Sequence, residues 1–172
     1  MGSEAKIGLE IERKYIIKMP DFLEISGKDN YTSSEILQIY LDSEKGETHR
    51  IRRRAFSDRV EYTETRKLRI DNMSVTEIEG EITEESFEIL AGKIKNGTIP
   101  ILKTRHSFTS GGYTYEIDVY GQWNRTAIME IELTVRGALP EIPPFIKVVR
   151  EVTGDKRFSN AAMSREFPEE EV

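Results

Sequence analysis

Residues 9–18, Leu-Glu-Ile-Glu-Arg-Lys-Tyr-Ile-Ile-Lys, alternate between charged and mostly apolar side chains. Successive side chains of a β-strand point to opposite faces, so this alternation predicts a strand. One face of that strand would carry the charges of Glu10, Glu12 and Lys14. The other face would be largely apolar, as expected for a face that packs against other parts of the protein.

The same alternation recurs along the chain. Seven further segments have strand character, with turn-forming Gly, Ser and Asn clusters between several of them. These segments are residues 35–42, 48–55, 60–67, 75–82, 101–109, 113–120 and 127–135. In five of them one face carries charges of a single sign: Arg50, Arg52 and Arg54; Glu77, Glu79 and Glu81; Lys103 and Arg105; Glu116 and Asp118; Glu130 and Glu132.

Two architectures could use such strands. In a two-layer sheet the apolar face covers a core and the charged face meets water, which is the common explanation for any single strand. Six strands with sorted charges, and only two helical stretches at 84–95 and 145–152, favour a sheet closed into a barrel instead. We therefore predict a mainly β (α+β) domain over residues 1–172. Its core is an eight-stranded antiparallel closed barrel, or tunnel, with a few covering helices and a disordered tail at 168–172.

The composition narrows the class of ligand. The chain has no cysteine, and its histidines, His49 and His106, fall on the outward faces of their strands. A metal would then be held mainly by carboxylates, which indicates a hard cation such as Mg²⁺ or Mn²⁺.

A net charge of -6 argues against nucleic acid or an anionic membrane as partner. No apolar run could span a membrane and no signal peptide is recognisable, so we expect a cytoplasmic protein. The oligomeric state stays open, with a homodimer as one option.

A barrel closed around these charged faces would enclose nine acidic and seven basic side chains, Lys67 among the bases. Burying so many charges costs a great deal unless they are matched or hydrated. A polyanion bridged by divalent cations would match both sets, because arginine and lysine bind phosphate oxygens and carboxylates bind metal. The pattern therefore predicts a phosphate–metal site.

Five short motifs occur in order across nearly the whole chain. They are E-x-E-x-K at 10–14, R-x-R at 50–52, K-x-R at 103–105, E-x-E at 130–132 and Glu-Val-Thr-Gly-Asp at 151–155. Together they closely resemble the CYTH family, the triphosphate tunnel metalloenzymes. The resemblance implies an eight-stranded antiparallel tunnel that binds triphosphate with Mg²⁺ or Mn²⁺.

The resemblance also implies roles for particular residues. Two adjacent bases, Arg66 and Lys67, compete for one inward position, and we choose Lys67. Tyr40 resembles a proposed proton acceptor of small bacterial members, although it could equally orient a water. The implied metal ligands are Glu10, Glu12, Asp118, Glu130 and Glu132, of which Glu130 and Glu132 are with Tyr40 the expected catalytic residues. The implied substrate-binding residues are Lys14, Arg50, Arg52, Lys67, Lys103, Arg105 and Glu79.

These expectations lead to one primary function and several alternatives. We predict a triphosphatase that removes the terminal phosphate of inorganic tripolyphosphate, because the recognised charges all serve the triphosphate itself. Nucleoside triphosphates are further possible substrates. The alternatives are a thiamine triphosphatase, an adenylyl cyclase of the same fold, or a polyphosphate- or nucleotide-binding module without turnover. Cyclic AMP formed from ATP would identify the cyclase, and binding without phosphate release would identify the module.

Overall fold

A computed structural model describes residues 6–172, so residues 1–5 of the predicted domain lie outside it. The elements in chain order are β1 (Lys6–Lys18), α1 (Phe22–Ser26), β2 (Asp29–Leu41), β3 (Glu47–Ala55), β4 (Val60–Arg69), β5 (Ser74–Glu81), α2 (Glu84–Ala91), β6 (Ile101–Ser110), β7 (Tyr113–Tyr120), β8 (Thr126–Glu132), β9 (Val148–Glu151), a 3₁₀ turn η1 (Lys156–Phe158) and α3 (Asn160–Met163).

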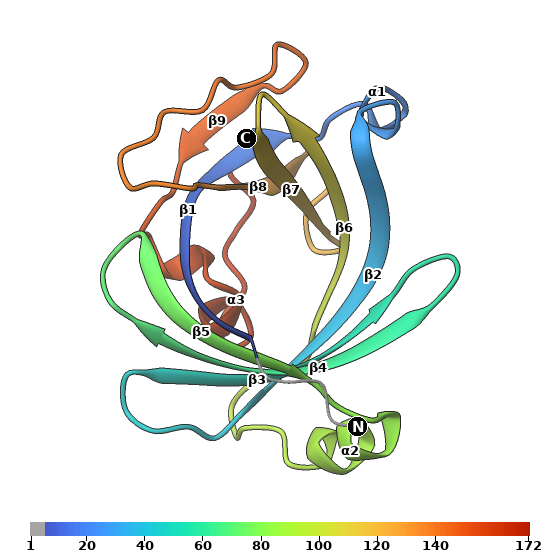
Figure 1. The fold of residues 1–172 in the computed structure, drawn as a ribbon, viewed down its shortest axis with the longest axis vertical. Helices are drawn as coiled ribbons and strands as arrows, with labels where there is room; N and C mark the ends of the chain where they lie inside the picture. The colour runs from blue at the N-terminus through green and yellow to red at the C-terminus, as the bar shows by residue number, and fades with distance from the viewer. Residues whose placement is uncertain (1–5) are drawn as a thin grey trace.

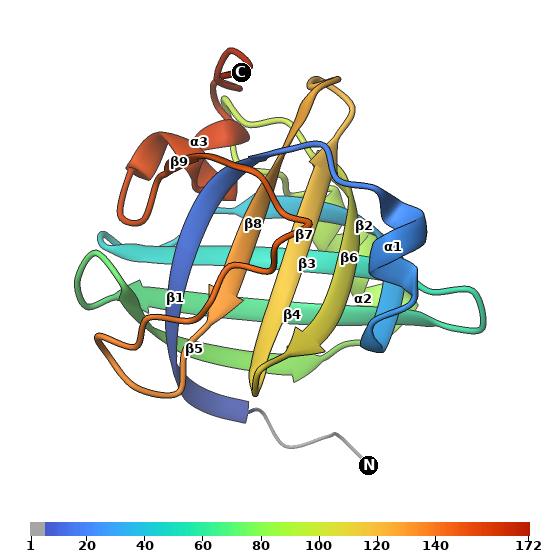
Figure 2. The same cartoon turned by 90° about the horizontal axis from the view of Figure 1, so that it is seen from above.

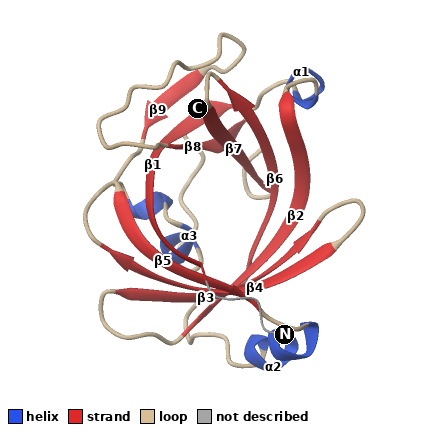
Figure 3. Ribbon diagram, viewed as in Figure 1, coloured by secondary structure: helices blue, strands red, loops and turns tan. Residues whose placement is uncertain are grey.

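Eight strands close into an antiparallel barrel, which confirms the predicted fold (Figures 1 and 3). The strand order is β5-β4-β3-β2-β6-β7-β8-β1, and β1 pairs again with β5 to close the ring. The first half of β1 lies beside β5, with Ile7 opposite Ile78. The second half lies beside β8, with Lys14 opposite Glu130. One long strand thus joins the two ends of the sheet.

The outside of the barrel is apolar where other segments cover it. Over β2 and β3, Ile39, Leu41 and Ile51 pack against Phe87 of α2. Over β1, β7 and β8, a larger cluster packs beneath α1 and the segment that links β8 to β9. That cluster contains Tyr15, Ile17, Ile25, Phe108, Tyr115, Ile117, Ala127, Met129, Ile131, Leu133 and Ile146. Figure 2 shows α1 lying against the β6 side of the barrel.

One end of the barrel interior is also apolar. Ile16 lies two residues beyond Lys14 on the same face of β1, and Ile128 pairs with it from β8. Phe158 and Met163 of the C-terminal segment pack against this layer, together with Trp123. We call this cluster the apolar plug: Ile16, Tyr40, Ile101, Tyr120, Trp123, Ile128, Val152, Phe158 and Met163. It seals one end of the charged interior, a feature that the alternation alone does not predict.

The helix predicted at 145–152 is wrong. Residues Val148–Glu151 form β9, which pairs with β1 so that Ile16 lies opposite Arg150. The β1 edge is covered by β5 only as far as Ile11, so the backbone groups beyond it need another strand. The other predicted helix forms as α2 but is shorter than expected. It ends at Ala91, capped by Gly92, instead of at residue 95.

The C-terminal tail, for which we predict disorder, makes several hydrogen bonds in this structure. The indole Nε1–H of Trp123 donates to the carbonyl oxygen of Pro168 at 3.0 Å. The Glu170 carboxylate accepts from the backbone N–H of Thr126 at 2.8 Å. These bonds hold the tail against the plugged end of the barrel. Among residues 6–172, no helix is long and apolar enough to cross a membrane.

Candidate active site

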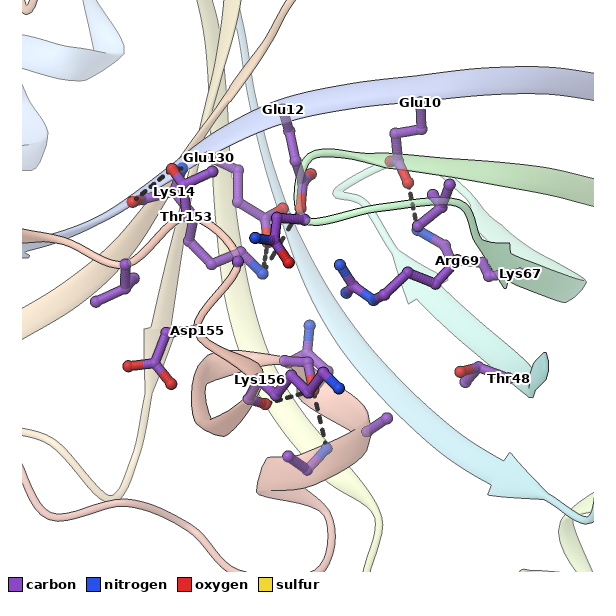
Figure 4. Close-up of a pocket in the computed structure, with 18 of the residues that line it drawn as sticks. Glu10, Glu12, Lys14, Thr48, Lys67, Arg69, Glu130, Thr153, Asp155 and Lys156 are labelled. Carbon is purple, nitrogen blue, oxygen red and sulfur yellow. Dashed lines mark hydrogen bonds and ion pairs between the residues drawn. The ribbon is translucent and has the colours of Figure 1, made fainter. Parts of the chain in front are cut away.

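A cavity of about 440 Å³ lies between the barrel wall and the C-terminal segment, which we define as residues 152–165. This volume is within the usual range for small-molecule sites, about 300–1,000 Å³. Of the residues predicted from sequence, nine line it: Glu10, Glu12, Lys14, Tyr40, Arg50, Arg52, Lys67, Arg105 and Glu130. Figure 4 shows Glu10 and Glu12 on one side of the cavity and Lys156 on the opposite side.

Carboxylates from β1 and β8 form one wall. The Nζ of Lys67 lies 2.6 Å from a carboxylate oxygen of Glu10, and the Nζ of Lys14 lies 2.8 Å from one of Glu130. Among residues 6–172, Glu12 forms one ion pair, a long one of 3.6 Å with the Nζ of Lys14. Burial and the neighbouring Glu130 raise the pKa of Glu12 to about 7. Glu12 is therefore a carboxylate that lacks sufficient positive charge around it.

Arginines from β3 form another wall, and these cations lack negative charge around them. Arg50 is 7% exposed, and its Nη1 donates to the Gln38 side-chain oxygen at 3.2 Å. The Nε groups of Arg50 and Arg52 are buried and have no hydrogen-bond partner among residues 6–172. Burial, followed by repulsion from Arg50 and Arg105, lowers the pKa of Arg52 to about 9. These guanidinium groups therefore lack an anion.

Tyr40 and Lys67 both line the cavity. Lys67 lines the cavity, whereas Arg66 is exposed and contacts Glu47 outside it. The hydroxyl of Tyr40 accepts a hydrogen bond of 2.7 Å from the Gln38 amide. Burial raises the pKa of Tyr40 above its ordinary value of 10.0, despite the opposing charge of Arg50. The phenol is thus protonated at neutral pH and can donate a hydrogen bond.

Asp118 and Lys103 lie behind the cavity wall and do not line it. The carboxylate of Asp118 accepts from Lys103 Nζ at 2.6 Å and from Arg105 at 2.7 and 2.8 Å. The side chains of Lys103 and Asp118 are each 1% exposed. Burial alone would raise the pKa of Asp118, but the charges of Arg105 and Lys103 lower it overall. Only Arg105 of this cluster reaches the cavity lining.

Two other predicted residues share the inward face without lining the cavity. Glu132 pairs with Glu12 across β1 and β8, but its side chain is exposed. Burial and the nearby Glu116 raise its pKa. Glu79 accepts a hydrogen bond of 2.8 Å from the Thr65 hydroxyl. The inward face is therefore longer than the cavity, and these acids lie beyond it.

The donor set is suited to a hard divalent cation, although the site is not preassembled. Among the described residues, no group of three or more His, Asp or Glu side chains converges as a metal site would require. Glu10, Glu12 and Glu130 nevertheless line one cavity with carboxylate oxygens, the ligands that Mg²⁺ and Mn²⁺ prefer. The under-compensated charge of Glu12 supports a cation here.

The C-terminal segment forms the remaining wall, which the sequence analysis does not assign. The Val152 N–H donates to the Lys14 carbonyl at 2.8 Å, and the Lys14 N–H donates to the Thr153 hydroxyl at 3.0 Å. Gly154 has φ of +77°, and a Cβ there would lie 2.9 Å from Cβ of Asn72. Gly154 in the 151–155 motif was the only sequence signal for this close approach.

No family model and no curated protein matches this chain. Among solved structures, the inorganic triphosphatase NE1496 matches with 27% identity and a TM-score of 0.58, covering 93% of this chain and 97% of that one. A second structure, described as the hypothetical protein NE1496, matches with 28% identity and a TM-score of 0.57, covering 92% and 99%. The PH1819 protein from Pyrococcus horikoshii OT3 matches with 27% identity and a TM-score of 0.56, covering 74% and 78%.

These matches agree with the barrel topology of this chain. The agreement with NE1496 extends over nearly the full length of both chains. The closed eight-stranded barrel and this full-length similarity show that the chain has the same fold as the inorganic triphosphatase NE1496.

Proposed function

We propose that the protein is a triphosphatase that releases the terminal phosphate of inorganic tripolyphosphate with Mg²⁺ or Mn²⁺. One observation carries the proposal: a single cavity holds a carboxylate that lacks positive charge, Glu12, and guanidinium groups that lack an anion, Arg50 and Arg52. A small anion alone would worsen the first deficit, and a cation alone would worsen the second. A phosphate chain carrying a divalent cation relieves both.

The ion pairs of the cavity suggest how such a ligand binds. In this structure Lys67 forms an ion pair with Glu10, and Lys14 forms one with Glu130. Phosphate oxygens would attract the two lysines, which would free the carboxylates for a cation. Metal and triphosphate should therefore bind with positive cooperativity. Triphosphate draws the lysines away from the carboxylates, and the cation then supplies the positive charge that those carboxylates have lost.

The residues of the cavity then have distinct tasks. Glu10, Glu12 and Glu130 would hold the divalent cation, which would supply charge neutralisation for the phosphates and activation of the attacking water. Arg50, Arg52 and Arg105 donate hydrogen bonds to phosphate oxygens and stabilise the charge that develops during transfer. Tyr40 donates to a phosphate oxygen or positions the water, because its raised pKa disfavours a role as base.

The residues outside the cavity receive revised roles in this proposal. Asp118 holds the Arg105 guanidinium in position, and Lys103 binds Asp118, so that neither contacts metal or phosphate. Glu132, with a raised pKa and a position opposite Glu12, accepts protons at the margin of the site. Glu79 orients Thr65 on the inward face.

The lining favours an inorganic substrate over one with an aromatic ring system. Tyr40 is the only aromatic side chain among the described residues that line the cavity, and its hydroxyl is engaged with Gln38. An adenine or thiamine ring is usually held by stacking on an aromatic or arginine plane. The arginines here are instead the groups available to phosphate.

Phosphate release should be measured with tripolyphosphate, ATP and thiamine triphosphate, each with Mg²⁺, with Mn²⁺ and with chelator. We expect the fastest release from tripolyphosphate and none with chelator. Glu10→Gln and Glu130→Gln should abolish turnover, and Arg52→Ala should mainly raise KM. Glu88→Gln, an exposed acid on α2, is the matched control and should behave as wild type.

Each alternative gives a different result in the same assays. Cyclic AMP formed from ATP would identify a cyclase. Tight tripolyphosphate binding without phosphate release under either metal would identify a binding module. Normal turnover in both glutamine variants of the cavity would refute the metal role of these carboxylates.

A further inference from the structure

The cavity contains basic groups beyond those that the triphosphate needs. Arg69 from the end of β4, with Lys156 and Arg165 from the C-terminal segment, also lines it. These three side chains are exposed, whereas Tyr40 and Arg50 in the same cavity are 5% and 7% exposed. The cavity therefore runs from a buried basic floor to an exposed mouth. We call Arg69, Lys156 and Arg165 the mouth cations.

The mouth cations are not neutralised by the protein. Among residues 6–172 none of the three forms an ion pair, and the Nη1 of Arg69 donates only to the Asp71 carbonyl, at 3.0 Å. Asp155, the acid of the C-terminal segment that lines the cavity, already forms an ion pair of 2.7 Å with Arg157. The mouth thus presents an excess of positive charge.

Neutral donors and a fixed backbone accompany these charges. Thr48, Asn72 and Ser159 line the same cavity. The side-chain Oδ1 of Asn160 accepts from the Tyr120 hydroxyl at 2.8 Å, which leaves the side-chain NH₂ group of Asn160 as a donor. The segment that carries Lys156 and Arg165 is held at both ends. The Val152 N–H donates to the Lys14 carbonyl at one end, and the Ile99 N–H donates to the Ser164 carbonyl at the other, each at 2.8 Å.

We propose that the mouth cations bind phosphoryl units beyond the third, so that the protein accepts linear polyphosphates longer than tripolyphosphate. This proposal rests on the proposed function, since it extends the substrate of the same site. Water attacks the terminal phosphorus, and its P–O bond to the bridging oxygen breaks with the electron pair staying on that oxygen. Orthophosphate and a chain one unit shorter are released, and the proton of the attacking water passes to solvent.

A chain held at both floor and mouth gains contacts that tripolyphosphate at the floor does not make. Each exposed cation contributes about a two- to fivefold change in affinity, the range measured for exposed ion pairs. Removal of all three should therefore weaken tetrapolyphosphate and longer chains by about tenfold or more. The same removal should change tripolyphosphate binding by no more than about twofold, by this reasoning.

The test compares wild type with the triple variant Arg69→Ala, Lys156→Ala and Arg165→Ala. Tripolyphosphate, tetrapolyphosphate and long-chain polyphosphate are used, with KM from phosphate release in Mg²⁺ and Kd from calorimetric titration in chelator. The matched control, Lys45→Ala, Lys93→Ala and Lys147→Ala, removes the same charge from exposed positions outside the cavity. Circular dichroism establishes that each variant is folded.

The expected result is a loss in KM and Kd confined to the longer chains, absent from the control. Equal weakening of all chain lengths would overturn the proposal, because the cations would then act only by general attraction. Wild type that hydrolyses tripolyphosphate but does not bind longer chains would also overturn it. If nothing is hydrolysed, the proposed function fails, but the titrations still test the mouth cations. Tighter binding of longer chains by wild type, lost in the triple variant, would support the mouth site. Equal binding of all chain lengths by wild type would refute the mouth site.

Discussion

Replacement of Asp118 by Asn should destabilise the fold strongly in the complete absence of metal. Asp118 accepts three short hydrogen bonds from Lys103 and Arg105, and its side chain is 1% exposed. Asparagine would leave two buried cations with one fewer negative charge and would turn an NH₂ group toward donors. Removal of one partner from a buried ion pair costs about 3–5 kcal/mol. That is a large share of a typical stability of about 5–15 kcal/mol.

The assay is urea unfolding in chelator, followed by fluorescence and circular dichroism. With an m value of about 2 kcal/mol/M, the midpoint should fall by about 2 M. A second substitution, Lys103→Met, removes the surplus cation, so the double variant should recover at least about 1 kcal/mol relative to the sum of the single changes. Because the assay contains no metal, a residue whose only task is to bind metal would show little loss.

Two results would refute this reasoning. One is a destabilisation by Asp118→Asn of less than about 1 kcal/mol, below the range for a broken buried pair. The other is strict additivity with Lys103→Met, which would mean that the two charges do not depend on each other. Either would return Asp118 to the set of candidate metal ligands.

Three further predictions follow from the cavity and the plug. Burial and Glu130 raise the pKa of Glu12 from 4.5 to about 7, so the native state holds this proton more tightly than the unfolded state. Wild type should therefore lose stability relative to Glu12→Gln as pH rises from 5 to 8 in chelator, and urea midpoints without such a trend would contradict the shift. Gly154→Ala should lower the free energy of unfolding by about 1–2 kcal/mol for the positive φ and by about 1–3 kcal/mol more for the contact with Asn72. Gly112 also has a positive φ but open space around it, so Gly112→Ala should show only the first loss in the same unfolding assay. Phe158→Ala should cost about 3–5 kcal/mol, because the side chain is 1% exposed within the apolar plug, and a thermal melt close to wild type would argue against the plug.

The barrel could be predicted from sequence because alternation reports which face of a strand a side chain takes. Residues 12–14 pair with residues 130–132 on the neighbouring strand, so that Lys14 lies opposite Glu130, and both side chains line the cavity. Alternation does not report depth along the barrel, however. Asp118 and Glu130 both point inward, yet Asp118 is sealed behind the wall and Glu130 lines the cavity. The division of one charged face into a cavity and a buried ion cluster depends on the plug, which only the folded chain defines.

The C-terminal part was predicted least well, because tertiary contacts override local signals there. Pro143-Pro144 is a good start for a helix, and the sequence that follows was assigned accordingly. The exposed edge of β1 instead recruits Val148–Glu151 as a strand. The segment after it has no periodicity that would place Lys156 or Asn160 in the cavity. Only Gly154 carries a local constraint, and its reason, the approach of Asn72, lies far away in sequence.

The most direct test of the central claim is a crystal structure of the protein with tripolyphosphate and Mn²⁺, with anomalous scattering used to locate the metal. We expect manganese inside the cavity on carboxylates from Glu10, Glu12 or Glu130, with phosphate oxygens on Arg50 and Arg52. Manganese bound to Asp118, or tripolyphosphate bound outside this cavity, would contradict it.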